Sequence, residues 1–434
     1  MTDTSSRDDH PRSIGALGAT AIVAGSMLGV GIFLTPRLVA DQVSSTGWYL
    51  LLWGLGGVVA LAGAVAYAEL GVMLPRAGGD YVYLRHTFGR SMGFASGWLL
   101  FAGVFCGSIS SMAAAVCTYQ LPMLLGTDLS GAVLGPLTGT QLCAMGLVLG
   151  LTVLNCAGVR LSTRMQILVT LVPFGVLTLV AGYALGTGPH ESSQAVTGDT
   201  PMSPMGLAVA FLSVYFAYAG WNAVAYVGGE IERPHRNIPL ALLGGTALVT
   251  VLYLVLCAAF AAVLGLGGVR EAFESGTASA TALMGPRAEV WVAGLIAVAL
   301  LGSVNGTVLQ GSRIAYAMAR DQALHSSLGR LNARSVPARS LWAQSIVSCV
   351  LIGTGSFEAL VELTSIAMFV MGGLAVVCLF VLRRREERGG LAGFDDLAVA
   401  HHADPVGHLA HDAEVVGNQH QRHAHLLLQF LQQL

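Results

Sequence analysis

Charged residues are scarce in this sequence, and lysine is absent. Only 11% of the 434 residues are charged and 54% are hydrophobic, whereas soluble domains carry about 25% charged residues. A chain of this size with so few charges must be solvated by lipid. Apolar runs long enough for a bilayer-spanning helix recur along it. Because lipid offers no water to backbone groups, only helices or a closed barrel can span it. The long unbroken runs favour helices, so the sequence predicts an all-α integral membrane protein.

Several motifs that carry chemistry are also missing. The seven cysteines show no Cys-x-x-Cys spacing and lie in or beside apolar runs, which predicts packing residues, not metal ligands or disulfides. No phosphate-binding loop is present, which excludes an ATP-driven pump. The apolar runs lack the clusters of histidine, acidic residues or cysteine that a membrane-embedded enzyme needs. The net charge of −2 provides no basic face for a nucleic acid. We expect no cofactor, no metal site and no enzymatic activity.

Ten apolar segments are candidate membrane spans, and the arginines between them indicate an orientation. With a cytoplasmic N-terminus, 18 arginines fall in inner segments and three in outer segments, as the positive-inside rule requires. We therefore expect a multi-pass protein of the cytoplasmic membrane with both termini in the cytoplasm. The spans are predicted at about residues 14–38, 48–73, 92–124, 139–157, 165–186, 205–230, 238–264, 289–311, 341–356 and 360–382.

Both ends of the chain differ from the predicted membrane core, residues 14–388. Residues 1–13 are polar and acidic, unlike the basic start of a cleaved signal peptide, so we expect a cytoplasmic N-terminal segment. Residues 389–434 hold seven of the twelve histidines and no apolar span. A His-rich tract can bind metal, but a disordered tail or a sequence read out of its frame is the preferred interpretation. The tail is left out of the functional interpretation.

Glycines interrupt the first predicted span. Gly25, Gly29 and Gly31 lie within the segment "VAGSMLGVGIF", where each costs about 1 kcal/mol relative to alanine. The sixth span has a softer break at "YAGWN", residues 218–222. Paired interruptions at corresponding positions of two halves indicate a transporter's binding site. The alternative is that the glycines serve close packing between helices.

Unwound segments of this kind suit a zwitterion. Helix-end N–H groups attract an anion, and helix-end carbonyls attract a cation. We therefore expect the first span to bind a carboxylate and the sixth span to bind an ammonium group. Glycine would let the backbone approach the substrate where a side chain would block it.

Six segments, in order, resemble the amino acid–polyamine–organocation superfamily, in particular the L-type amino-acid transporters and bacterial serine/threonine exchangers. They are "GSMLGVGIF" (25–33), "AYAELGVMLPRAGGDYVYLRHTFG" (66–89), "NCAGVRLSTRMQ" (155–166), "FAYAGWNAVAYVGGEIERPHRNIP" (216–239), "GSVNG" (302–306) and "SRIAYAMARDQAL" (312–324). The resemblance implies a five-plus-five inverted-repeat fold, with repeats at about 14–186 and 205–382 and with helices one and six broken. It also implies alternating access to a site between spans one, six and eight.

The resemblance further implies which residues bind substrate. The carboxylate would be held by backbone of the first span, at Met27, Gly29, Val30 and Gly31. The ammonium group would be held by carbonyls of the sixth span, at Phe216, Ala217 and Ala219, with the Phe216 ring as a lid. Three more residues would shape the site or link spans, namely Trp221, Asn222 and Asn305. The alternatives are that Phe216 is ordinary core and that the two asparagines only bridge helices.

The sequence departs from the family pattern in four places. Val30 replaces a common serine, and Pro173 stands where many relatives have a lysine, so a lysine-based coupling mechanism is not expected. Spans eleven and twelve are missing. The loop at residues 126–140 lacks the cysteine that tethers a partner glycoprotein in animal relatives, so no disulfide-linked subunit is implied, and a homodimer stays open.

The favoured function is secondary transport of neutral amino acids by exchange or proton coupling. No acidic residue is expected near the membrane midplane, which disfavours cationic amino acids and polyamines. Two alternatives stay open, a truncated permease remnant that does not transport and, less favoured, a membrane-embedded enzyme.

Overall fold

The computed structural model describes residues 12–127, 129–187, 202–354 and 357–387. Most of the predicted N-terminal segment and the His-rich tail lie outside the described residues. The chain divides into two units, Ser6–Leu382 and Met1–Ser5 together with Arg383–Leu434. The arrangement given below is that of the first unit.

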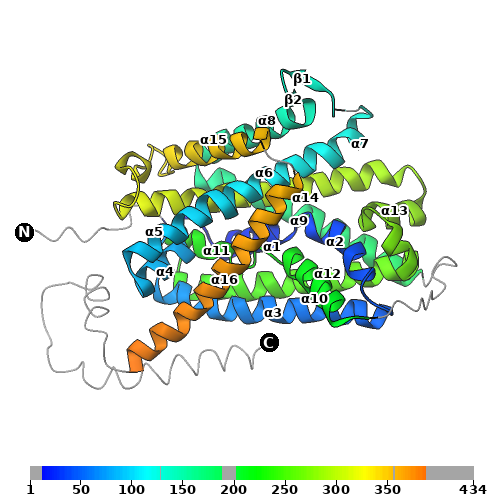
Figure 1. The fold of residues 1–434 in the computed structure, drawn as a ribbon, viewed down its shortest axis with the longest axis horizontal. Helices are drawn as coiled ribbons and strands as arrows, with labels where there is room; N and C mark the ends of the chain where they lie inside the picture. The colour runs from blue at the N-terminus through cyan, green and yellow to red at the C-terminus, as the bar shows by residue number, and fades with distance from the viewer. Residues whose placement is uncertain (1–11, 128, 188–201, 355–356, 388–434) are drawn as a thin grey trace, which may run out of the picture. The chain divides into compact units, whose positions relative to one another are not determined.

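The first half of the described chain is helical apart from one small hairpin (Figure 1). Two π-helical stretches, η1 (Leu99–Cys106) and η2 (Val116–Gln120), join three helices into the segment Arg90–Leu125. Strands β1 (Ala132–Leu134) and β2 (Leu137–Thr138) pair antiparallel. The α-helices are α1 (Ala16–Met27), α2 (Gly31–Ala40), α3 (Thr46–Met73), α4 (Asp80–Phe88), α5 (Arg90–Trp98), α6 (Gly107–Ala115), α7 (Leu121–Leu125), α8 (Gly139–Cys156) and α9 (Val159–Gly186).

The second half repeats the pattern of a short broken helix followed by long helices. Helix α12 departs from helical geometry at Gly265, where φ is +67°. The elements are α10 (Pro204–Ala217), α11 (Ala223–Tyr226), the 3₁₀ turn η4 (Gly228–Glu230), α12 (Pro234–Glu271), α13 (Ser275–Met284), α14 (Ala288–Arg320), the 3₁₀ turn η5 (Ser326–Gly329), α15 (Ala338–Thr354) and α16 (Phe357–Glu387).

Among the described residues, seven helices are long and apolar enough to cross a membrane, and eight if the bent pair α1 and α2 counts as one span. Each of the ten predicted segments contains a helix, but α10 and α15 have only 14 and 17 residues. The protein is a multi-pass helical membrane protein. The count of ten spans stays a prediction.

Polar residues at the predicted boundaries start several helices. Ser45 accepts the Trp48 N–H and so caps α3. Thr138 and Gln141 form a reciprocal capping box at the start of α8. Such caps satisfy donors that have no partner within the helix, and they fix where each long helix begins.

The short helix α1 lies among the long helices. It contacts α9, α12, α14 and α11, and Figure 1 shows α1 and α11 in the middle of the bundle, with α3 and α12 side by side along one edge. Eight of the twelve α1 residues are buried. The broken segments are therefore surrounded by protein, as non-helical backbone at membrane depth requires.

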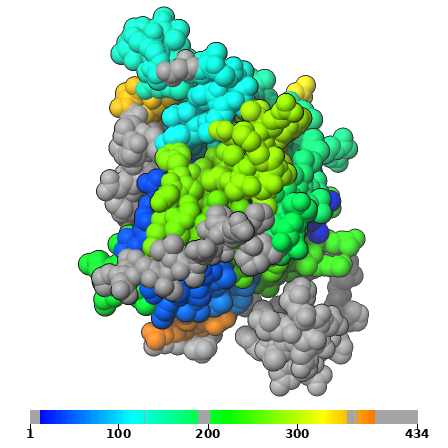
Figure 2. All heavy atoms as spheres, turned by 90° about the vertical axis from the view of Figure 1, so that its right-hand side faces the viewer, coloured from blue at the N-terminus to red at the C-terminus, as the bar shows by residue number. Residues whose placement is uncertain are grey.

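Helix α13 connects α12 to α14 and contacts α2. In Figure 2 it belongs to the yellow-green surface that faces the viewer. Glu274, just before α13, is 8% exposed and accepts hydrogen bonds from Gln120 and Thr277. Burial raises the pKa of this carboxyl. The contact with Gln120 joins α13 to the end of the third predicted span.

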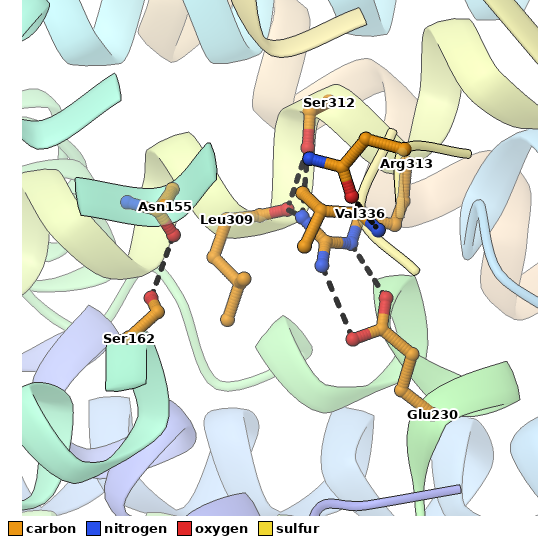
Figure 3. A network of polar contacts seen from close by, with 8 residues as sticks. Asn155, Ser162, Glu230, Leu309, Ser312, Arg313 and Val336 are labelled. Carbon is orange, nitrogen blue, oxygen red and sulfur yellow. Dashed lines mark hydrogen bonds and ion pairs between the residues drawn. The ribbon is translucent and has the colours of Figure 1, made fainter. Parts of the chain in front are cut away.

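A buried ion pair joins η4 to α14 (Figure 3). Arg313 Nε and Nη2 donate to the two carboxylate oxygens of Glu230, at 2.7 and 3.1 Å. Arg313 Nη1 also donates to the Leu309 carbonyl and to Ser312. Neither charged side chain is exposed. The Glu230 carbonyl accepts the N–H groups of Ser13 and Ile14, so the pair also anchors the start of the described chain.

We expect the Arg313→Met variant to be strongly destabilised, because it removes the cation that compensates the buried Glu230 carboxylate. Breaking a buried pair in this way costs about 3–5 kcal/mol. The Glu230→Gln/Arg313→Met double variant should recover much of the loss. The measurement is the apparent melting temperature in detergent, with Arg339→Met, at an exposed arginine, as the matched control. Equal melting temperatures for Arg313→Met and the control would contradict the prediction.

Candidate functional site

The break in the first span exposes backbone donors. Helix α1 ends at Met27, α2 begins at Gly31, and the two axes differ by 43°. The N–H groups of Val30, Gly31 and Ile32 have no backbone acceptor among the described residues. Free N–H groups at a helix N-terminus, together with the helix dipole, form an anion-binding arrangement.

The break in the sixth span lies directly against the first. Helix α10 ends at Ala217, and α11 begins at Ala223. Between them Gly220 adopts a φ of +102°, and a Cβ there would lie 2.7 Å from the Ser26 carbonyl oxygen. Both the conformation and the contact require glycine at this position.

Tyr253 of α12 links the two breaks. Its hydroxyl lies 2.5 Å from the Met27 carbonyl oxygen and 3.2 Å from the Ala217 carbonyl oxygen. One hydroxyl has a single proton to donate, so one of the two carbonyls keeps its capacity for another donor. Sequence reasoning missed this residue, because a tyrosine inside an apolar span gives no local sign of its partner.

A cavity of about 120 Å³ lies between the breaks. Its walls come from both broken spans and from the third, eighth and tenth predicted spans. Nine of the ten predicted site residues line it, namely Met27, Gly29, Val30, Gly31, Phe216, Ala217, Ala219, Trp221 and Asn222.

Asn305, the tenth, does not line this cavity. It is fully buried in α14, where its Nδ2 donates to Gln166 and its Oδ1 accepts from Asn155. Ser162 extends this network by donating to Asn155 (Figure 3). These contacts are the ones expected from the alternative interpretation, in which Asn305 links helices.

The glycines of the first span have different surroundings. A Cβ at Gly25 would lie 2.3 Å from side-chain atoms of Gln166 and Thr170, and a Cβ at Gly31 would lie 2.5 Å from the Ala217 Cα. A Cβ at Gly29 would meet only ordinary contacts, the nearest being Ser303 Oγ at 3.4 Å. Helix packing therefore accounts for Gly25 and Gly31, and Gly29 is the glycine that leaves space at the cavity.

Several polar side chains on the cavity wall were missed by sequence reasoning. Gln310 Nε2 donates to Ser26 Oγ at 2.7 Å, and Ser303 Oγ donates to the Ser26 carbonyl at 3.3 Å. These bonds join α14 to the last turn of α1. Ser26 lies within the glycine-rich segment, but only the fold brings α14 beside it.

An acidic residue also lines the cavity, although sequence reasoning looked for acidic residues only near the membrane midplane and did not consider this one. Asp80, the first residue of α4, is 1% exposed. Its Oδ2 accepts from the Tyr226 hydroxyl at 2.8 Å, and Tyr226 accepts from Asn222 Nδ2 at 3.4 Å. Burial raises the pKa of Asp80 to about 6, although Tyr226 and Tyr67 oppose the shift. Asp80 is the last residue of the sequence "AGGD", which lies between the second and third predicted spans.

The described residues contain no group of three or more histidine, cysteine or acidic side chains that could hold a metal ion. The polar groups at the cavity are backbone N–H and carbonyl groups, hydroxyls, amides and one carboxyl. This set can bind a small zwitterion without a metal ion.

Curated relatives match most of this chain. It is 30% identical over 387 residues to the large neutral amino acids transporter small subunit 2 of Rattus norvegicus, covering 86% of this chain and 70% of the relative. It is 28% identical over 377 residues to the b(0,+)-type amino acid transporter 1 of Mus musculus, covering 86% and 76%. The Asc-type amino acid transporter 1 of Mus musculus is 29% identical, with 86% and 71% covered.

Solved structures share the fold at low sequence identity. The structure of MhsT in complex with L-phenylalanine matches with a TM-score of 0.58 and 15% identity, covering 86% of this chain and 89% of that one. Mhp1, a nucleobase-cation-symport-1 family transporter, matches with a TM-score of 0.58 and 13% identity, covering 88% and 82%. The prediction of an inverted-repeat transporter fold with broken helices one and six is confirmed.

The family model described as amino acid permease matches residues 14–399. The predicted transport of amino acids is confirmed, and neither the enzyme nor the non-transporting remnant is favoured. The chain belongs to the amino acid permease family.

Proposed function

We propose that this permease moves neutral amino acids across the cytoplasmic membrane by exchange or proton coupling, with both termini in the cytoplasm. The observation that carries the proposal is the shared cavity of the two broken spans. Free N–H groups end on one side of it, and helix-end carbonyls lie on the other. The name of one of the relatives described above refers to large neutral amino acids, which supports the substrate class.

The substrate carboxylate would bind at the start of α2. The N–H groups of Val30 and Gly31 lack backbone partners among the described residues, and the positive end of the α2 dipole favours an anion there. Met27 and Gly29 complete this side of the site, and Gly29 supplies its free space. A serine hydroxyl is replaced here by Val30, so backbone groups carry the recognition.

The substrate ammonium group would bind at the end of α10. Carbonyls near a helix C-terminus carry the negative end of the dipole. The Phe216 carbonyl already accepts the Ala219 N–H, and the Ala217 carbonyl shares the Tyr253 hydroxyl with Met27. Each carbonyl oxygen has a second lone pair, and the Ala217 carbonyl, which has the longer of the two Tyr253 contacts, is the acceptor proposed for the ammonium group. Phe216, Trp221 and Asn222 close the cavity around the substrate side chain.

Transport is proposed to need no disulfide-linked subunit. Residues 126–140, which precede α8 on the proposed outer side, contain no cysteine. The name of one relative identifies it as a small subunit. The present chain is proposed to differ from that relative in needing no disulfide-linked subunit.

Substitutions of Gly29 and Gly31 distinguish a role in substrate binding from a role in helix packing. We expect Gly29→Val to weaken amino acid binding about tenfold, which corresponds to about 1.4 kcal/mol, with little change in melting temperature, because the new side chain enters the cavity. We expect Gly31→Val to lower the melting temperature, because overpacking against Ala217 costs about 1–3 kcal/mol. Binding of radiolabelled amino acid and thermal unfolding in detergent are the measurements. Gly150→Val, at an exposed glycine with no neighbour within 4 Å, is the matched control. Loss of stability in Gly29→Val alone would overturn this assignment.

Counterflow tests the proposed function directly. Proteoliposomes with the full chain should take up labelled serine, threonine, alanine or leucine several-fold faster when they contain unlabelled amino acid. In an exchanger, the binding site returns to the outer side of the membrane faster when a substrate is bound to it. Lysine should not be taken up. Liposomes without protein and liposomes with the Gly29→Val variant are the controls. Uptake of lysine but of no neutral amino acid would refute the proposed substrate class.

A further inference from the structure

We propose that Asp80 is the proton-binding group of this permease and that its protonation is coupled to movement of the amino acid. The inference rests on the proposed function of the cavity and names its coupling ion. Four properties of the Asp80 carboxyl support the inference: its position, its burial, the charges around it and its connection to the broken sixth span.

The carboxyl lies on the cavity wall and is only partly satisfied. Its Oδ2 accepts from Tyr226, whereas its Oδ1 is buried and receives no well-formed hydrogen bond among the described residues, although the Tyr67 hydroxyl lies near enough to favour the charged form. A buried carboxylate oxygen without a well-formed hydrogen bond disfavours the charged form. Protonation removes the charge and adds a donor that can bond to a neighbouring acceptor.

No cation compensates Asp80 in the described part of the chain. The ionisable groups that interact with it are Tyr67 of α3, Tyr83 of α4, Tyr215 of α10, Tyr226 of α11 and Cys378 of α16. Its own helix carries two basic residues, of which Arg85 pairs with Asp321 and His86 is not among the groups that shift the pKa of Asp80. All groups that face the carboxyl are neutral hydroxyls or a thiol, so a proton is the one positive charge this surrounding accepts readily.

Both protonation states are accessible near neutral pH. With a pKa of about 6, Asp80 in the present conformation binds a proton below that pH and releases it above. The carboxyl is already buried, so opening the cavity to water would hydrate it and lower its pKa, because burial is what disfavours the charged form. One proton would then be held while the cavity is closed and would leave after it opens on the other side, with no other bond made or broken.

The carboxyl is physically joined to the broken sixth span. Tyr226 donates to Asp80 and accepts from Asn222, which lies on the cavity wall. The backbone is joined as well, because the Gly78 N–H donates to the Tyr226 carbonyl and Ala77 pairs with Val227. A change in charge at Asp80 therefore acts on α11 through both a side chain and the backbone.

The test uses proteoliposomes of the full chain with a pH-sensitive dye inside. An inward gradient of alanine should acidify the lumen of wild-type liposomes. Asp80→Asn should abolish the acidification and make alanine uptake independent of pH. Asp41→Asn, which removes an exposed carboxyl, should acidify the lumen as wild type does.

A second variant keeps the inference testable if Asp80→Asn does not fold. Tyr226→Phe removes the donor that stabilises the carboxylate, so the folded-state pKa of Asp80 rises. The fall of proton-driven alanine uptake with increasing pH should then occur about one pH unit higher, the shift expected for loss of one hydrogen bond to a charged group. A residue with only a structural role would change the rate of uptake but not this midpoint.

The outcomes separate the inference from the proposed function. Wild-type counterflow of alanine without acidification would overturn the proton site while leaving amino acid exchange intact. Acidification of the lumen by the Asp80→Asn variant to the same extent as by wild type would also overturn the proton site. Uptake of lysine or arginine by wild type that is lost in Asp80→Asn, with proton movement retained, would also overturn it and make Asp80 a binder of cationic side chains. Absence of counterflow in wild type would refute the proposed function and the inference with it.

Discussion

The structure depends on one constraint, which is that backbone polar groups inside a bilayer must find partners within the protein. A continuous helix usually meets this constraint through its own hydrogen bonds, and the breaks in spans one and six interrupt those bonds. They are tolerated because each break faces the other. Gly220 lies against Ser26, Gly31 lies against Ala217, and the Tyr253 hydroxyl lies between the Met27 and Ala217 carbonyls. The groups left over lie at a cavity, where the proposed zwitterionic substrate would supply the missing donors and acceptors.

The surroundings of the breaks are held by buried polar contacts. The Glu230–Arg313 pair fixes η4 to α14, and the bonds of Asn305 with Asn155 and Gln166 fix α14 to α8 and α9. Bonds between polar side chains in a membrane are individually worth about 1 kcal/mol, so their importance here lies in geometry. They set the position of α14 against α1, and thereby the place of Ser303 and Gln310 at the cavity.

Run length and local composition predicted the helices and both breaks, because these features act over a few residues of chain. The ten site residues were implied by the resemblance to a known family, and nine of these ten lie on the cavity wall. What the sequence could not assign was the neighbour of each residue. Gly25 and Gly31 pack against α9 and α10, Asn305 bonds to other helices, and Tyr253 reaches two carbonyls from a distant span. These roles depend on contacts between segments more than 35 residues apart, which no local pattern records.

Asp80 illustrates the same limit and its physical reason. An acidic residue at mid-span is costly and would have attracted attention in the sequence, whereas one in a connecting segment is ordinary. Gly78 and Gly79, with φ values of +119° and +50°, turn this segment toward the bundle. A Cβ on Gly79 would lie 2.6 Å from the Tyr226 ring, so the close approach needs glycine. The turn thus places a carboxyl at the cavity without placing it in a predicted span, which is why the charge of Asp80 is proposed to respond to whether water reaches the cavity.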